Sequence, residues 1–142
     1  MVSQDFRDAL DDLEDLIDMH QDNASNLCKS GGMVFLRLII MLADDVQIAK
    51  QACTIFTLAN QYNAFVQEFC YKLGISELMS FFCKESTPLA LKASLIGCIS
   101  SIIKGANFEA KKRFVTEIDG LPWLAAQVGQ CAKIVGSKRS ED

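Results

Sequence analysis

The residues that could carry acid–base or nucleophilic chemistry are few and poorly placed for it. His20 is the single histidine in 142 residues, so any Ser-His-Asp or Cys-His arrangement would have to be built around it. It lies at the end of an acidic segment, where an exposed helix-terminal side chain is the expected role. The acids between Asp11 and Asp18 point in different directions on a helix, which is typical of a solvated face and not of paired catalytic carboxylates. The sequence therefore indicates a protein that is not an enzyme.

The cysteines are a second group with chemical potential. Six of them fall within helical apolar patterns without any C-x-x-C pairing, at Cys28, Cys53, Cys70, Cys83, Cys98 and Cys131. One histidine cannot complete a Cys/His zinc set with cysteines spaced in this way. We expect free thiols that act as small core residues in a reducing compartment, with no metal and no cofactor.

Charge and hydropathy limit the classes of partner. The formal net charge is −4, which gives no broad attraction for phosphate backbones or anionic lipid. The N-terminus lacks a basic segment followed by an apolar one, so no secretory signal is predicted. The longest apolar stretch, Met33 to Ala43, contains Arg37 and is too short to span a bilayer. We expect a soluble, cytoplasmic protein that binds neither nucleic acid nor membrane. Its acid-rich first 22 residues are either a solvated helix face or a docking edge for a basic partner.

One pattern recurs along the chain around glycines at positions 32, 74 and 120. These glycines are 42 and 46 residues apart, within the roughly 40–47 residues of armadillo and HEAT units. We expect each glycine to lie in a tight turn between helices that needs a positive φ. Apolar residues keep the same offsets from each glycine: five before (Leu27, Phe69, Val115), one after (Met33, Ile75, Leu121), four after (Leu36, Leu78, Leu124) and eight after (Ile40, Phe82, Val128). The last three offsets trace one face of a helix that follows the glycine.

The repeating unit is a triplet of helices. We expect helices near 22–30, 33–43 and 45–61, then near 63–73, 75–84 and 88–104, and finally near 107–119 and 121–135. Asp44 with Gln47 resembles a capping box, and Thr87 before Pro88 resembles an N-cap. Ahead of the repeats, apolar residues at helical spacing predict an amphipathic helix over 3–20 that caps the first unit, namely Phe6, Leu10, Leu13 and Ile17.

The predicted fold is an all-α, right-handed, armadillo-like solenoid of about two and two-thirds repeats. We expect one domain over 1–136, divided into a capping helix (3–20), repeat 1 (22–61), repeat 2 (62–104) and a partial repeat 3 (107–135), with a polar tail at 137–142. The third copy has no long third helix. We therefore expect the last helix pair to expose apolar surface that a partner, the tail or a second copy of the chain in a homodimer would cover.

The two long third helices carry the candidate binding site. In this architecture such helices line the concave side, and each has a polar stripe opposite an apolar one. The stripe consists of Gln47, Lys50, Gln51, Thr54, Thr57 and Gln61 on the first helix and of Ser94, Cys98, Ser101 and Lys104 on the second. Solvation explains each residue taken alone, whereas together they form the best candidate for a partner-binding surface.

Three segments carry a more specific resemblance. They are LEDLIDMHQDNASNLCKSGGMVFL, AKQACTIFTLANQYNAFVQEFCYKLGISELMSFF and LKASLIGCISSIIKGANFEAKKRFVTEIDGLPWL. Over about residues 8–128 the chain resembles the armadillo domain of cytosolic nucleotide exchange factors of heat shock protein 70, the Hsp-binding-protein and Fes-type family. The most telling piece is the Q-x-N-A-x-x-Q-E-x-x-x-x-L-G run from Gln61 to Gly74.

The resemblance implies a function and a partner. Such a protein clasps one lobe of the chaperone's nucleotide-binding domain, displaces it and lowers its affinity for ADP, so that ATP enters. The family usually has about four repeats and this chain completes two, so a shorter solenoid would embrace less of the lobe. The alternative is an armadillo adaptor that binds another protein or an extended peptide without exchange activity. Adaptors of that kind use ladders of Trp and Asn on their third helices, and neither long helix of this chain contains a Trp.

Overall fold

A computed structural model describes residues 3–61, 63–105, 108–116 and 119–140, with side chains described in these ranges except at 105, 108–110 and 131–140. The chain divides into two compact units, residues 1–107 and residues 108–142. Each unit is described separately. The predicted single domain over 1–136 stays a prediction.

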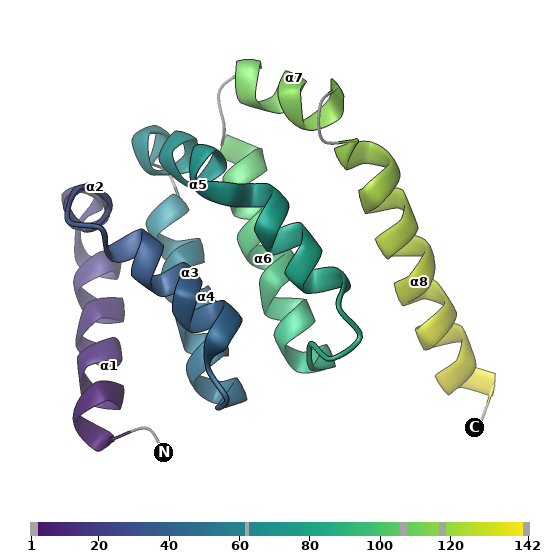
Figure 1. Cartoon of the computed structure of the whole chain (residues 1–142), viewed down its shortest axis with the longest axis horizontal. Coiled ribbons are helices and arrows are strands. Elements are labelled where there is room, and N and C mark those ends of the chain that lie inside the picture. Colours follow the sequence, from purple (N-terminus) through teal and green to yellow (C-terminus); the bar gives the residue numbers. More distant parts are fainter. Residues whose placement is uncertain (1–2, 62, 106–107, 117–118, 141–142) are drawn as a thin grey trace. The chain divides into compact units, whose positions relative to one another are not determined.

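The first unit is built from six helices (Figure 1). They are α1 (Gln4–Met19), α2 (Gln21–Lys29), α3 (Gly32–Leu42), α4 (Val46–Asn60), α5 (Ala64–Cys83) and α6 (Leu89–Gly105). The predicted all-α class is confirmed for the described residues, in which every regular element is a helix. α4 packs between α1 and α6, while α3 packs on α4 and α5 packs on α6. Figure 1 shows the same two layers, with α3 and the second half of α5 in front of α4 and α6.

The core lies between these layers because each helix buries one apolar face. α1 begins at its N-cap Ser3, whose side chain accepts a hydrogen bond from the Phe6 N–H. Its predicted face is correct, since Leu10 and Ile17 are buried. Equivalent positions of the first two copies are buried as well: Met33, Leu36 and Ile40 on α3, and Ile75, Leu78 and Phe82 on α5. In the first two copies, the apolar positions one, four and eight residues after the glycine are therefore core positions, whereas Leu27 and Phe69, five before it, are half-buried.

The α5 helix is broken in the middle at Gly74, where φ is 151° and ψ is 62°. The break separates the two helices that were predicted at 63–73 and 75–84. Arg37 of α3 closes it: one guanidinium nitrogen lies 2.7 Å from the Leu73 carbonyl oxygen and 3.1 Å from the Glu77 carboxylate. A cation at the end of a helix segment satisfies a carbonyl and complements the helix dipole. Arg37, the one charged residue within the apolar stretch Met33 to Ala43, thus links α3 to α5.

Two helix caps differ from their predictions. The N-cap of α4 is Asp45 and not Asp44, and its carboxylate accepts from the N–H groups of Gln47 and Ile48. Thr87 is separated from the first residue of α6 by Pro88, and its hydroxyl donates to the Phe81 carbonyl at 2.7 Å. α6 begins at Leu89, and the Pro88 carbonyl accepts from the Lys92 N–H at 3.0 Å. A sequence pattern alone cannot decide which of two adjacent residues caps a helix, because tertiary packing selects between them.

The second unit contains α7 (Phe108–Thr116) and α8 (Gly120–Ser140), which pack on each other. Phe114 is buried, whereas the predicted core residue Val115 is 42% exposed. Leu121 and Val128 are also exposed, so this copy does not bury the face that α3 and α5 bury. Helix α8 extends to Ser140 and includes part of the predicted polar tail at 137–142.

The turn glycines act in two different ways. Gly74 has the positive φ that was predicted, but Gly31, at φ 86°, takes it in the first turn and Asp119, at φ 56°, takes it in the third. Gly32 and Gly120 instead permit close approach, because a Cβ would overlap the side chain of Leu27 in the first case and the ring of Phe114 in the second.

In the described part of the chain, no single helix has the length and apolar character needed to cross a bilayer. The bent pair of α2 and α3 meets that requirement only when its two helices are counted together.

Candidate functional site

The candidate site lies on the neighbouring helices α4 and α6, which contain nine of the ten predicted binding residues, while Gln61 is the C-cap of α4. Four of these residues are exposed, namely Gln47, Thr54, Gln61 and Lys104, and five are half-buried, namely Lys50, Gln51, Thr57, Ser94 and Ser101. The tenth, Cys98, is 0% exposed and belongs to the core. It shares the buried side of α6 with Leu91, Leu95 and Ile102, at helical spacing. Its assignment to the polar stripe is therefore wrong.

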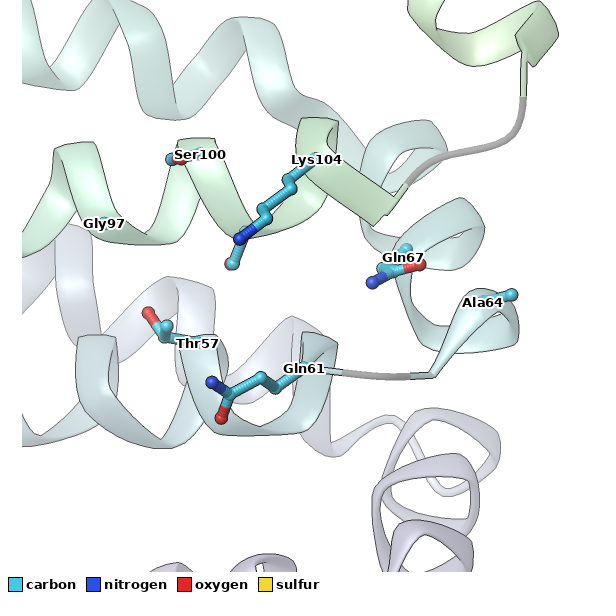
Figure 2. Close-up of a pocket in the computed structure, with 8 residues that line it drawn as sticks. Thr57, Gln61, Ala64, Gln67, Gly97, Ser100 and Lys104 are labelled. Carbon is cyan, nitrogen blue, oxygen red and sulfur yellow. The ribbon is translucent and has the colours of Figure 1, made fainter.

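Part of the stripe surrounds a hollow of about 510 Å³, which we call the polar hollow. Its lining residues are Thr57, Gln61, Ala64, Gln67, Gly97, Ser100, Ser101 and Lys104. Figure 2 shows Thr57 on α4, Gln61 at the C-terminal end of that helix, Lys104 on the facing helix α6 and Gln67 on α5. The structure thus gathers four predicted residues, and it adds four that were not predicted.

Hydrogen bonds to the backbone fix several of the lining side chains. The Thr57 hydroxyl donates to the Cys53 carbonyl at 2.8 Å, and the Ser101 hydroxyl donates to the Cys98 carbonyl at 2.7 Å. Gln67, which is 6% exposed, donates to the Asn60 carbonyl at 2.6 Å. That carbonyl belongs to the last residue of α4, where helices leave acceptors without an internal partner. These contacts hold the wall of the polar hollow in one arrangement.

The other end of the stripe lies against α1. The Gln51 amide donates to the Asp11 carboxylate at 2.5 Å, and Arg7 pairs with Asp45 at 2.6 Å. The hydrogen bond from Arg7, followed by those from the backbone of Ile48 and Gln47, holds the pKa of Asp45 below its usual value. Gln51 is therefore engaged within the chain, and the accessible part of the stripe shifts toward the C-terminal ends of α4 and α6.

Two pairs of buried thiols lie behind this surface. Cys98 donates to the Cys53 carbonyl at 3.2 Å, which joins α6 to α4, and Cys28 contacts Cys70 between α2 and α5. The neighbouring thiol, followed by burial, raises the pKa of Cys53 and of Cys70. The described cysteines form no disulfide, and four of them are buried as predicted, but Cys83 is exposed and not in the core. The side chain of Cys131 is outside the described residues.

The charge on α4 and α6 is of one sign. Neither helix contains an Asp or a Glu, whereas together they carry Lys50, Lys92 and Lys104. Lys92 lies over the ring of Phe82, 5.6 Å from its centroid, so it faces α5. Lys50 and Lys104 remain on the side of the stripe. In a chain with a net charge of −4, this surface is locally cationic around the polar hollow, whose lining residues include Lys104 and no carboxylate.

Sequence reasoning missed Ala64, Gln67, Gly97 and Ser100 for identifiable reasons. Ala64 and Gln67 belong to α5, whereas the predicted stripe was confined to the two long third helices. The Q-x-N-A-x-x-Q run at Gln61–Gln67 was the available signal, because it places two glutamines on either side of the turn. Gly97 and Ser100 lie before and after the buried Cys98 in the sequence. If Cys98 had been assigned to the core, these two residues would have been the candidates for the accessible side of α6.

Within the described residues, no group of three or more His, Cys, Asp or Glu side chains lies close enough to hold a metal ion. The arrangement offers hydrogen bonds and one sign of charge, which suits binding. Comparisons of the chain with family models, with curated proteins and with solved structures each gave no match.

Proposed function

We propose that the chain binds the nucleotide-binding domain of heat shock protein 70 through the surface of α4 and α6 and promotes ADP release. Residues 8–128 supply the resemblance that names this partner. The observation that carries the proposal is that Thr57, Gln61, Ser101 and Lys104, which were predicted as binding residues, surround one accessible hollow between two adjacent helices.

An armadillo-like arrangement is part of the same proposal. Stacking of α1, α4 and α6 in one layer, with α3 and α5 in the other, is compatible with a solenoid in which third helices form the binding side. α1 would then take the place of a third helix ahead of the first repeat.

To promote nucleotide exchange, such a surface must bind one arrangement of the chaperone lobes more tightly than the other, and it needs no catalytic side chain. A partner that bound the closed and the open arrangements of the chaperone lobes equally would shift neither population. The chain must therefore prefer the arrangement with weakened ADP contacts. The contacts around the polar hollow would carry that preference.

Stopped-flow release of a fluorescent ADP analogue from the chaperone domain tests the proposal. The full chain should accelerate release, and the double variant Lys50→Glu, Thr54→Leu should bind more weakly while keeping its helical circular dichroism. A complex without acceleration would favour the adaptor function. Absence of both acceleration and a complex in calorimetry would exclude exchange and chaperone binding together.

A further inference from the structure

Lys104 is the ionisable residue among those that line the polar hollow, and it has no counter-ion in the described part of the chain. Several other basic side chains of the first unit have partners. Lys72 pairs with Glu68 at 3.2 Å, and Lys29 lies 5.8 Å from the centroid of the Phe65 ring. The polar hollow is lined by no carboxylate. Its charge is therefore unbalanced, which favours an anionic group as its occupant.

The hydrogen-bonding groups around the polar hollow have the same preference. Thr57, Ser101 and Gln67 already donate to carbonyls of the chain. The ammonium of Lys104, the amide of Gln61 and the hydroxyl of Ser100 have no such acceptor among the described residues. Figure 2 shows Lys104 extending from α6 toward the side on which Gln61 lies, at the end of α4. A group that only accepts hydrogen bonds, with two oxygens, matches these donors.

We propose that the polar hollow receives an Asp or Glu side chain of the bound chaperone domain, with Lys104 as its ion-pair partner and Gln61 as a second donor. This inference rests on the proposed function. One cation suits a singly charged carboxylate better than a phosphate, which arginine and lysine clusters usually bind. A volume of about 510 Å³ holds such a side chain together with bridging waters.

A purely structural role for Lys104 makes a different prediction. The residue lies in the last turn of α6, where a cation complements the helix dipole. That role would lower thermal stability on substitution without changing affinity for a partner. Affinity and melting temperature must therefore be measured on the same variants.

The first test is calorimetric titration of the chaperone's nucleotide-binding domain with the full chain. Lys104→Gln should weaken the complex by about tenfold to a hundredfold, the usual range for loss of one charged hydrogen bond. Gln61→Glu, a nearly isosteric change at an exposed residue, should weaken it comparably because the new carboxylate pairs with Lys104. Lys104→Arg should retain most of the affinity. Lys84→Gln, which removes the same charge from an exposed position away from the polar hollow, serves as the matched control and should change nothing.

A second test identifies the partner residue. A carbodiimide activates a carboxylate, which then forms an amide with a lysine amine in contact with it, for a net loss of one water. Mass spectrometry should find Lys104 joined to an Asp or Glu of the chaperone domain. A normal complex in which Lys104→Gln and Gln61→Glu bind as tightly as the original chain would overturn the inference and leave the proposed function standing. No complex with the original chain would overturn both.

Discussion

Among single residues, Gly74 holds the most demanding position in the first unit. Its φ of 151° lies where side chains are rarely accommodated, and a Cβ there would come within 2.6 Å of a guanidinium nitrogen of Arg37. That nitrogen is the one that meets the Leu73 carbonyl and the Glu77 carboxylate. One added methyl group would therefore strain the backbone and displace the side chain that closes the break in α5.

Gly74→Ala should consequently lower the free energy of unfolding by about 1–3 kcal/mol, the usual cost of a residue held in a sparsely populated backbone region. Gly97→Ala is the matched control, because Gly97 lies in α6 and a Cβ there meets nothing within 4 Å. That change should be neutral or stabilising by up to ~1 kcal/mol. Urea unfolding followed by circular dichroism measures both. Equal stability of the two variants would show that the break imposes no constraint.

Residue roles were predicted in part. The three anchoring glycines were found from their spacing, but the predicted positive φ occurs only at Gly74 among them, since Gly32 and Gly120 act through contacts with Leu27 and Phe114. Such contacts depend on the approach of a neighbouring turn, which spacing does not encode. Cys98 was wrongly assigned to the polar stripe for a related reason. A small residue at the border between the polar and the apolar face of a helix can lie on either face, and here packing against α4 buries it.

Among the helices, the attachment of α1 to α4 depends on ionisation. Arg7 pairs with Asp45, which also caps α4. Because the pKa of Asp45 is lowered in the folded chain from its ordinary value of 3.8, its contribution to stability is complete above that value. The contribution is lost as the pH falls through the lower, folded pKa.

Asp45→Asn tests this attachment, because asparagine still caps a helix but carries no charge to pair with Arg7. The variant should unfold at lower urea concentration than the original chain at neutral pH. The difference should begin to shrink near pH 3.8 and disappear once the pH is below the lower pKa that Asp45 has in the folded chain. Asp12→Asn is the control, since Asp12 is exposed on α1 and forms no ion pair among the described residues. A difference between Asp45→Asn and the original chain that persisted at low pH would contradict the role of the ion pair.

The positions of helices were the most predictable feature. Apolar periodicity over many residues defines them, and all nine predicted segments correspond to helical backbone in the described residues, with α5 carrying two of them on either side of Gly74. Their ends were less predictable, as at Asp45 and Leu89, because neighbouring residues compete for each cap. The repeat pattern predicted that residues of α4 and α6 lie together around the polar hollow. It did not predict the residues that α5 contributes, because their position depends on the path of the turn after Gln61.

On the scale of the molecule, residues 1–107 form a unit with its own core and contain every residue that lines the polar hollow. A chain of about 100 residues buries enough apolar surface to fold alone, whereas one below about 40 seldom does. The fragment 1–107 should therefore unfold cooperatively in urea and bind the chaperone domain within about threefold of the full chain, a loss of under ~1 kcal/mol. A peptide of residues 108–142, the matched control, should show little helix and no binding. If the fragment 1–107 folds but does not bind, part of the binding site must lie on α7 and α8. If it does not fold, the stability of the first unit depends on the second.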